Sequence, residues 1–243
     1  MERRHLAECG STNTEALAHL RDGGGPLILS AGRQTAGRGR LGRAWLTDQA
    51  GDDAALTFSV ALPLPAELDL SGLSLAVGCT VADTLDPGGE RIRLKWPNDL
   101  FLDGAKLGGI LIETVPLPAQ QRGVVIGIGL NLAPLPPDAD RGAFASGHAA
   151  LHTLDPAATA AATLDRLAPA LRALLADFQT LGFAPWQAAF ARRDLAAGRR
   201  VRVGAQDGIA RGVGAGGELL LETATGILPL SGGELSLRWE TAL

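Results

Sequence analysis

The dipeptide Asp103-Gly104 constrains the fold of this 243-residue chain more than any other feature. Apolar residues run along both sides of it, at 100–102 and 107–115, and Asp-Gly between two such runs is a strong hairpin signal. A tight hairpin joins antiparallel neighbours, whereas parallel strands need a long crossover. We therefore expect an α+β fold with a mixed or antiparallel sheet, which excludes a doubly wound parallel one.

Other apolar patterns supply the remaining elements of this fold. The first predicted helix opens at residues 11–15 with a capping box formed by Thr12 and Glu15, and the longest begins at Asp155-Pro156 and ends at Gly182. Two further helices are expected at 71–85 and 185–193, and further strands at 27–30, 56–62, 91–96 and 124–132.

The pattern changes after Gly198. Five short apolar runs separated by glycines follow, at 201–203, 209–213, 219–221, 227–230 and 235–239. About 45 residues of this kind are typical of a small β-barrel. We therefore expect one domain at 1–194, with a mixed sheet and flanking helices, and a small barrel at 195–243.

Composition narrows the class of protein. A formal net charge of −4 produces no global field toward nucleic acid or an anionic membrane, so any anion site must be local. Two cysteines, Cys9 and Cys79, fit a reducing compartment better than a disulfide framework. No signal peptide is visible, and no stretch reaches the roughly 18 apolar residues that span a bilayer. We expect a soluble, cytoplasmic protein.

Rare residue types gather in a few segments. Of 22 basic residues only Lys95 and Lys106 are lysines, and the only asparagines are Asn13, Asn98 and Asn131. Lysine is a compact point charge, whereas arginine is a planar fork. Two nearby lysines in a chain that otherwise uses arginine therefore indicate a need for an ammonium group, with chance as the alternative.

The segment GRGRLGR at 37–43 is the densest cationic stretch. Glycines between Arg38, Arg40 and Arg43 let the backbone approach a ligand, and guanidinium groups bind carboxylates and phosphates in bidentate fashion. A solvated basic turn or a nucleic-acid patch is the alternative. The acidic composition and the lack of interleaved aromatic residues argue against nucleic acid.

Two other segments carry candidate ligand groups. In KWPND at 95–99, the proline breaks a strand and presents Asn98 and Asp99 at a turn, although such turns are common. In GIGLN at 127–131, both glycines and Asn131 share one strand face, which allows a flat ligand such as a purine to lie against it. A bulge or close packing is the alternative for these glycines.

Together these segments describe many cations, a bare backbone face and no catalytic nucleophile. Such a set suits a reaction between two anions, for example a carboxylate attacking the α-phosphate of ATP. Two unit charges about 4 Å apart repel by roughly 4 kcal/mol at an effective dielectric of 20. A lysine and two arginines placed around them would remove that part of the barrier.

The combination of these segments resembles the biotin–protein ligases. The matching segments are Ser11-Thr12-Asn13, Gln34, 37–43 with Trp45, 95–99, 106–111, 127–131 and 232–238. They occur in family order, and GRGRxGR with KWPND and K-L-x-G-I-L is specific to that family. The resemblance implies a biotin/lipoate ligase-like catalytic domain and an SH3-like C-terminal barrel.

The resemblance also implies an activity: biotin and ATP form biotinyl-5′-AMP with Mg²⁺, and the biotin then passes to a lysine of a biotin carboxyl carrier protein. Lys106, Arg40 and Asp99 would be catalytic. The implied biotin-binding residues are Ser11, Thr12, Asn13, Gln34, Arg38, Gly39, Arg40 and Lys106. The implied ATP-binding residues are Arg38, Arg40, Arg43, Trp45, Lys95, Asn98 and Asn131.

The chain also departs from the family pattern. Only ten residues precede Ser11, so we expect no DNA-binding domain and no DNA partner, while a homodimer is possible because family members often dimerise. The segment 47–55 is longer and more acidic than usual. A lipoate or octanoate ligase of the same fold, and a non-catalytic biotin-binding module, are the competing interpretations.

Overall fold

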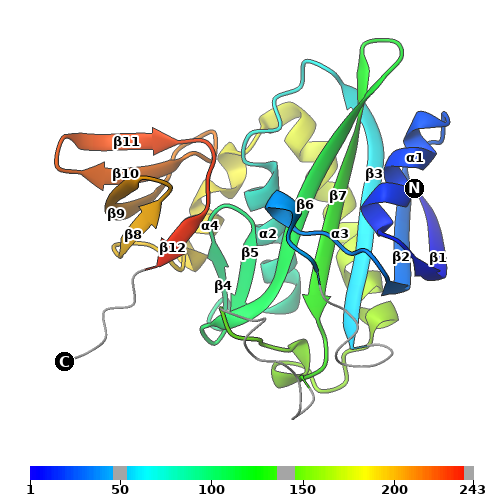
Figure 1. Ribbon diagram of the computed structural model, residues 1–243, viewed down its shortest axis with the longest axis horizontal. Coiled ribbons are helices and arrows are strands. Elements are labelled where there is room, and N and C mark those ends of the chain that lie inside the picture. The colour runs from blue at the N-terminus through cyan, green and yellow to red at the C-terminus, as the bar shows by residue number, and fades with distance from the viewer. Residues whose placement is uncertain (46–53, 136–145, 238–243) are drawn as a thin grey trace. The chain divides into compact units, whose positions relative to one another are not determined.

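The computed structural model describes residues 1–45, 54–135 and 146–237 (Figure 1). The acidic segment expected at 47–55 therefore lies almost wholly outside the described residues, as does Arg238. The chain forms two compact units, one from 1–68 and 102–169 and the other from 69–101 and 170–243. The expected boundary between residues 194 and 195 remains a prediction.

Seven strands of the described residues form the larger sheet, in the order β1-β2-β3-β7-β6-β5-β4. Their bounds are β1 Glu2–Cys9, β2 Leu27–Gln34, β3 Ala55–Pro65, β4 Ile92–Lys95, β5 Asp99–Leu102, β6 Ala105–Leu117 and β7 Gln121–Asn131. β1 and β2 run parallel, whereas β2 with β3, β3 with β7 and β6 with β7 are antiparallel. The expected mixed sheet is confirmed.

The predicted hairpin lies between β5 and β6. Asp103 and Gly104 both have positive φ, 50° and 85°. This is the pair of left-handed residues that a two-residue type I′ turn requires, and it matches the twist of the flanking strands. Aspartate tolerates that conformation and glycine adopts it without steric cost, so these two residue types determine the turn.

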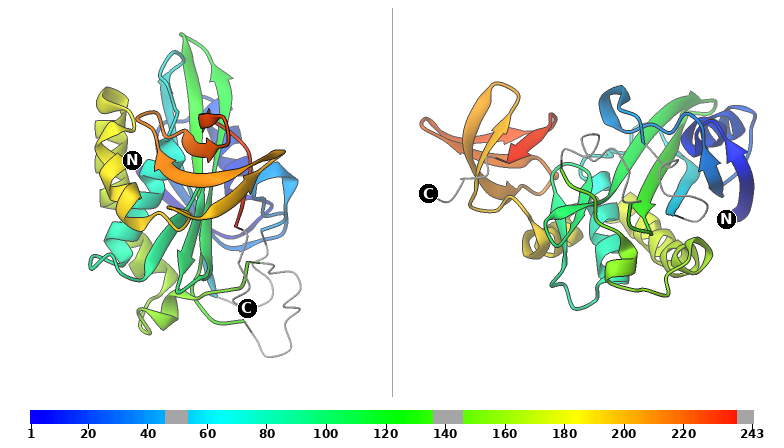
Figure 2. Two further views of the ribbon diagram at one scale, coloured as in Figure 1. Left: turned by 90° about the vertical axis from the view of Figure 1, so that its left-hand side faces the viewer. Right: turned by 60° about the horizontal axis from the view of Figure 1, so that its bottom comes forward.

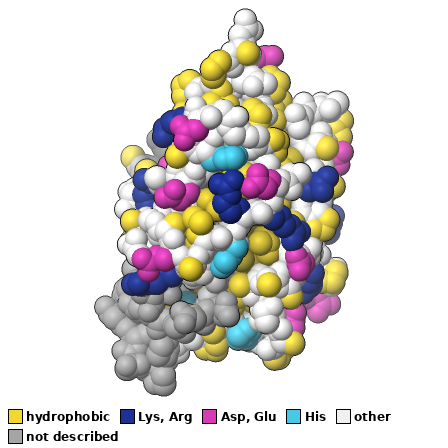
Figure 3. Space-filling model, turned by 90° about the vertical axis from the view of Figure 1, so that its right-hand side faces the viewer, with side chains coloured by type: hydrophobic (Ala, Val, Ile, Leu, Met, Phe, Trp, Pro, Cys, Tyr) yellow, Lys and Arg dark blue, Asp and Glu magenta, His cyan; other side chains and the backbone are white. Residues whose placement is uncertain are grey.

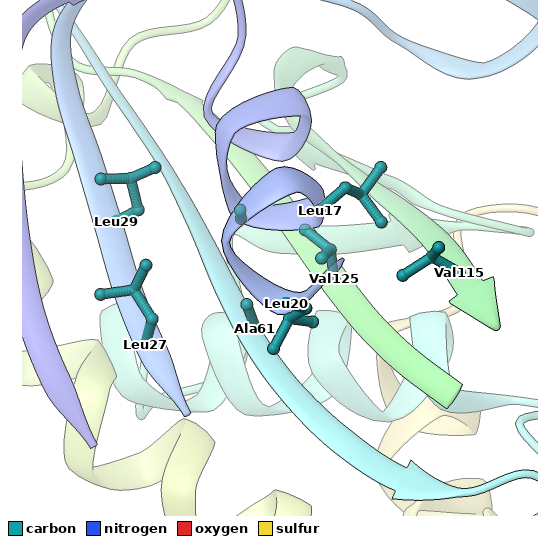
Figure 4. Packing of buried hydrophobic residues seen from close by; sticks show 8 residues of the cluster. Leu17, Leu20, Leu27, Leu29, Ala61, Val115 and Val125 are labelled. Atoms are coloured by element: carbon teal, nitrogen blue, oxygen red, sulfur yellow. The ribbon is translucent and has the colours of Figure 1, made fainter. Parts of the chain in front are cut away.

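Helix α1 (Thr12–Arg21) covers one face of this sheet and contacts β2, β3, β6 and β7. Leu17 and Leu20 pack onto a buried apolar cluster with Leu27, Val115 and Val125 (Figure 4). The helix begins where expected, but no capping box forms. Ser11 is the residue that precedes the helix, and it makes no side-chain capping hydrogen bond.

Strand β1 was not anticipated from the sequence. It lies at the edge of the sheet, and most of its residues are exposed, so it has no apolar alternation to detect. Basic and acidic side chains alternate over the face at this edge (Figure 3). Arg3 pairs with Asp165, and Arg4 with Glu2. Charges on an edge strand discourage pairing with another chain.

The other helices are α2 (Leu73–Leu85), α3 (Ala160–Leu181) and α4 (Gln187–Arg193). The expected start of α3 at Asp155-Pro156 is wrong. A 3₁₀ turn at Leu151–Thr153 precedes it, and Thr159 Oγ1 accepts a 3.2 Å hydrogen bond from the Ala162 N–H, as an N-cap does. No helix of the described residues has the length and apolar character needed to cross a membrane.

Within the second unit, the buried Arg193 joins α4 to α2. Its side chain is 3% exposed, and it donates to Asp83 at 2.9 Å and to Asp86 at 3.1 Å. It also donates to the carbonyls of Asp86 and Ile92. Every side of this guanidinium is therefore met by an acceptor, as a buried charge requires.

The C-terminal strands lie at the predicted positions, but they do not close into the predicted barrel. They are β8 Arg200–Val203, β9 Gln206–Val213, β10 Leu219–Thr223, β11 Gly226–Leu230 and β12 Leu235–Leu237. Within the described residues they form one antiparallel sheet in the order β11-β10-β9-β8-β12 (Figure 2). β11 and β12 are opposite edges of this sheet, so the strands form an open SH3-like sheet and the expectation of a barrel is wrong.

Candidate active site

The sheet face beneath α1 loses its side chains toward one end. Val125 belongs to the apolar cluster, but the next two residues on the same face of β7 are Gly127 and Gly129. Gly129 lies opposite Gly109 of β6, and Gly127 lies opposite Ser59 of β3. The result is a floor of small residues beside the first turn of α1, with the Asn13 amide against Gly127 and the Trp45 ring against Gly129.

A buried hydrogen-bond network borders this floor. The Thr12 N–H donates to Gln34 Oε1 at 2.7 Å, and the Thr12 hydroxyl lies 3.1 Å from the same oxygen. The Ser59 hydroxyl lies 2.8 Å from Thr12 Oγ1 and 2.6 Å from Asn13 Oδ1. Ser11 is also buried. The structure thus brings together the expected Thr12, Asn13 and Gln34, and it adds Ser59, which was not expected from the sequence.

The arginine-rich segment folds back on itself above this network. The Gly39 N–H donates to the Arg43 carbonyl at 2.7 Å, and the Trp45 N–H donates to the Gly37 carbonyl at 2.9 Å. A 3₁₀ turn at Arg40–Gly42 forms the tip. There Leu41 is 77% exposed and has a φ of 56°, which a leucine rarely adopts.

Trp45 lies directly on the floor. A Cβ added to Gly129 would lie 2.5 Å from the Trp45 ring, so only glycine permits this contact. The indole Nε1 is buried and has no hydrogen-bond partner among the described residues. Buried polar atoms are nearly always paired, so this N–H is a donor suited to a ligand.

Arg38 bridges the loop and the sheet. Its Nη2 atom lies 3.1 Å from Thr14 Oγ1 and 3.3 Å from a carboxylate oxygen of Glu113 on β6. Glu113 also accepts a 2.8 Å hydrogen bond from the Asn13 side-chain amide. Glu113 was not among the residues expected from the sequence.

Asn131 positions the segment that contains Lys106. Its amide donates to the carbonyls of Lys106 at 3.2 Å and of Ala149 at 3.1 Å. Lys106 also forms a parallel bridge with His148, whose pKa is lowered by burial although a contact with the Ala133 carbonyl opposes this. A neutral imidazole at pH 7 does not compete with the lysine ammonium for an anion.

The KWPND turn belongs to the second unit. Trp96 is buried and donates to the Gly217 carbonyl at 3.1 Å, while the Ser74 hydroxyl donates to the Pro97 carbonyl at 3.1 Å. Lys95 Nζ lies 5.7 Å from the centre of the Phe101 ring, a cation–π distance. The expected turn is present, and the grouping of Lys95, Asn98 and Asp99 with the residues of the first unit remains a prediction.

The chemistry available here rests on cations and hydrogen bonds. Burial raises the pKa of the Cys79 thiol to about 12, so this cysteine is not a nucleophile at neutral pH. Among the described residues, no group of three or more His, Cys, Asp or Glu side chains could hold a metal ion.

Comparison with known proteins gives a consistent result. Residues 11–131 match the model of the biotin/lipoate A/B protein ligase family. The chain is 34% identical to biotin–[acetyl-CoA-carboxylase] ligase of Paracoccus denitrificans, covering 91% of this chain and 94% of that protein. It is 37% identical to the bifunctional ligase/repressor BirA of Escherichia coli, but spans only 64% of the length of that relative.

A solved structure supports the same relationship. Biotin protein ligase from Aquifex aeolicus in complex with biotin and ATP has a TM-score of 0.79 and 27% identity to this chain. The match covers 98% of both chains. The likeness therefore extends through the C-terminal sheet as well as the residues matched by the family model.

Proposed function

Because the chain belongs to the biotin/lipoate A/B protein ligase family, we propose that it is an ATP-dependent biotin–protein ligase. In the first step a carboxylate oxygen of biotin attacks the α-phosphorus of ATP, a new P–O bond forms, and pyrophosphate leaves. In the second step an acceptor lysine amine attacks the acyl carbon of biotinyl-5′-AMP. An amide forms, AMP leaves, and the amine loses a proton.

The observation that carries this proposal is the buried network of Thr12, Asn13, Gln34 and Ser59 beside a floor of small residues. The ureido ring of biotin has both N–H donors and a carbonyl acceptor, so it can use hydroxyl and amide groups held in place. The dithiolane ring of lipoate and the tail of octanoate have no such groups. Buried polar atoms left without a partner by those ligands would carry a cost.

Biotin is proposed to lie on this floor with its ring at the start of α1. Its carboxylate would then extend toward the arginine-rich loop and Lys106. The proposed biotin-binding residues are Ser11, Thr12, Asn13, Gln34, Arg38, Gly39, Arg40 and Lys106.

ATP is proposed to bind beyond biotin, with its base near Trp45. The buried indole N–H that no described group accepts, and the close contact of the ring with Gly129, support a flat heteroaromatic ligand here. The proposed ATP-binding residues are Arg38, Arg40, Arg43, Trp45, Lys95, Asn98 and Asn131.

Lys106 and Arg40 are proposed to lower the barrier of the first step, because cations fixed in place offset the repulsion between two anions. Asp99 supplies carboxylate oxygens suited to Mg²⁺, which commonly binds through one or two carboxylates and substrate phosphates. When bound, the ion would neutralise phosphate charge, and Asp99 would also orient the acceptor lysine.

We propose that the acceptor is a biotin carboxyl carrier protein or domain of a carboxylase such as acetyl-CoA carboxylase. Action in the cytoplasm without DNA, and a homodimer, are proposals as well. Both cysteines are thiols, which fits a reducing compartment. Sedimentation of the purified chain measures its oligomeric state directly.

Biotin-dependent ATP–pyrophosphate exchange with Mg²⁺ tests the proposed function, with lipoate and octanoate as parallel substrates. We expect exchange with biotin only. Lys106→Ala should reduce its rate by about 100-fold, the loss typical of removing one charge-stabilising donor. Arg211→Ala, in the C-terminal sheet, is the matched control and should leave the rate unchanged. Exchange with a fatty acid only, or with none of the three, would refute the proposal.

A further inference from the structure

Strand β6 carries a carboxylate where its pattern calls for an apolar side chain. Leu111, Glu113 and Val115 share one face of the strand, and Glu113 lies opposite Val125 of β7. Val115 and Val125 are both part of the buried cluster beneath α1. A charge at the border of an apolar core is costly unless it is paired, and a local rule broken in this way often marks a functional position.

Glu113 is paired from two directions, and its side chain is only 29% exposed. From α1, the Asn13 amide donates to Oε2 at 2.8 Å. From the arginine-rich loop, Arg38 Nη2 lies 3.3 Å from Oε1. The same Nη2 atom lies 3.1 Å from Thr14 on α1. Glu113 therefore connects a buried helix residue with the first arginine of the loop.

The carboxylate also helps to orient the Asn13 amide. An ionised carboxylate only accepts hydrogen bonds, so the NH₂ group of Asn13 must face Glu113. Its carbonyl oxygen consequently faces Ser59, whose hydroxyl lies 2.6 Å away. Ser59 in turn contacts Thr12, and Thr12 contacts Gln34. The polarity of the network is thus set at this end by the Glu113 carboxylate together with the Leu111 carbonyl, which accepts a 3.3 Å hydrogen bond from the same Asn13 amide.

We propose that Glu113 is a positioning residue of the ligand site: it clamps Arg38 against the start of α1 and helps to orient the Asn13 amide. The identity of the ligand as biotin rests on the proposed function. The clamp, meaning the contacts of Glu113 with Arg38 and Asn13, is independent of it. In this arrangement Arg38 forms a wall of the proposed biotin subsite.

Glu113→Gln keeps the size of the side chain but removes the charge and the strict acceptor character. We expect the KM for biotin to rise about fivefold. This is the size of effect expected from losing the partly exposed Arg38–Glu113 ion pair and weakening the hydrogen bond of the Asn13 amide. kcat should stay within about twofold, because Glu113 acts through Asn13 and Arg38 and not on the reacting atoms. A purely structural defect would instead lower kcat through loss of folded enzyme.

Limited trypsin digestion without ligand gives a second, independent measurement. Trypsin cleaves after arginine, and Arg40 and Arg43 lie in the loop that Arg38 anchors. Cleavage at these two sites should be several-fold faster in Glu113→Gln and in Arg38→Gln. Glu222→Gln is the matched control, because Glu222 also pairs with an arginine, Arg211 on the C-terminal sheet, with side-chain exposures of 42% and 49%. It should change neither the cleavage rate nor the KM for biotin.

A double variant separates the clamp from two unrelated effects. If Glu113 acts mainly through Arg38, the two substitutions should not add up. The double variant Glu113→Gln/Arg38→Gln should then differ by no more than about twofold from the more impaired single variant. The proposal would be overturned if the double variant multiplied the cleavage rates of the two single variants. It would also be overturned if Glu113→Gln kept the wild-type cleavage rate and the wild-type KM for biotin. Accelerated cleavage in a chain that shows no biotin-dependent exchange would uphold the clamp and refute the ligase function.

Discussion

Adding one methyl group at Gly127 should disable the proposed biotin subsite. A Cβ at this position would lie 2.3 Å from Asn13 Oδ1 and 2.9 Å from Asn13 Cγ. Contacts below 3.0 Å do not persist, so the amide must move by at least 0.7 Å, the difference between 3.0 and 2.3 Å. Asn13 lies on the first turn of a packed helix, and Gly127 is central in the sheet, so the side chain must give way.

The size of the effect follows from the hydrogen bonds that this movement breaks. The Asn13 amide would lose its 2.6 Å contact with Ser59 and its 2.8 Å bond to Glu113. Each buried polar group left unsatisfied costs roughly 1–3 kcal/mol. We therefore expect Gly127→Ala to lower the free energy of unfolding by about 2 kcal/mol. If the same loss appears in binding, biotin affinity falls about 30-fold.

Urea denaturation and calorimetric titration with biotin measure the two effects. Gly123→Ala is the matched control on the same strand and face. Its Cβ would lie 2.8 Å from Leu20 Cδ1 and Val115 Cγ1, so it overpacks the apolar cluster and should cost about 1–3 kcal/mol of stability. Biotin affinity should stay within twofold in this control. Wild-type affinity in a folded Gly127→Ala protein would show that the position of the Asn13 amide does not determine biotin binding.

Three further outcomes are expected from the second unit. Trp96→Phe removes the hydrogen bond to Gly217 and should cost about 1 kcal/mol in urea denaturation; an unchanged midpoint would contradict it. Arg193→Leu leaves Asp86 buried without its cation and should cost about 3–5 kcal/mol, read from the same curves. Burial alone would raise the pKa of Asp86, but hydrogen bonds from the Ile92 N–H and Arg193 outweigh it and lower the pKa. The stabilisation is therefore present at neutral pH and lost as the pH falls below about 4, and Asp86→Asn should flatten that part of the pH profile.

Local patterns predicted most of the elements. Alternation and helical spacing located the strands and helices from residue 27 to residue 237, and Asp103-Gly104 predicted the hairpin through the backbone angles that these residues allow. Strand β1 was missed because an edge strand with both faces exposed has no apolar period. Barrel closure was wrongly expected because it depends on pairing between the two edge strands, β11 and β12, which leaves no local signature.

The candidate site was predicted in part, for the same physical reason. Thr12, Asn13 and Gln34 were expected from the resemblance to the biotin–protein ligases, and the structure brings them into one network. Ser59 and Glu113 lie inside long strands, where a polar residue usually faces water. Their inward direction follows from the register of β3 and β6 against β7, which is a tertiary property.

One signal in the sequence does point to Glu113. Glu113 lies two positions from Leu111 and two from Val115, so strict alternation places its carboxylate on an otherwise apolar face. The start of α1 shows the complementary departure, because Thr12 and Asn13 contact the sheet and Ser11 makes no capping hydrogen bond. The two departures are related, because the polar side chains at the start of α1 bond to groups on the sheet and the Glu113 carboxylate is one of those groups. Each of these polar groups finds its partner across the site, so the charge is paired without a cap at the helix start.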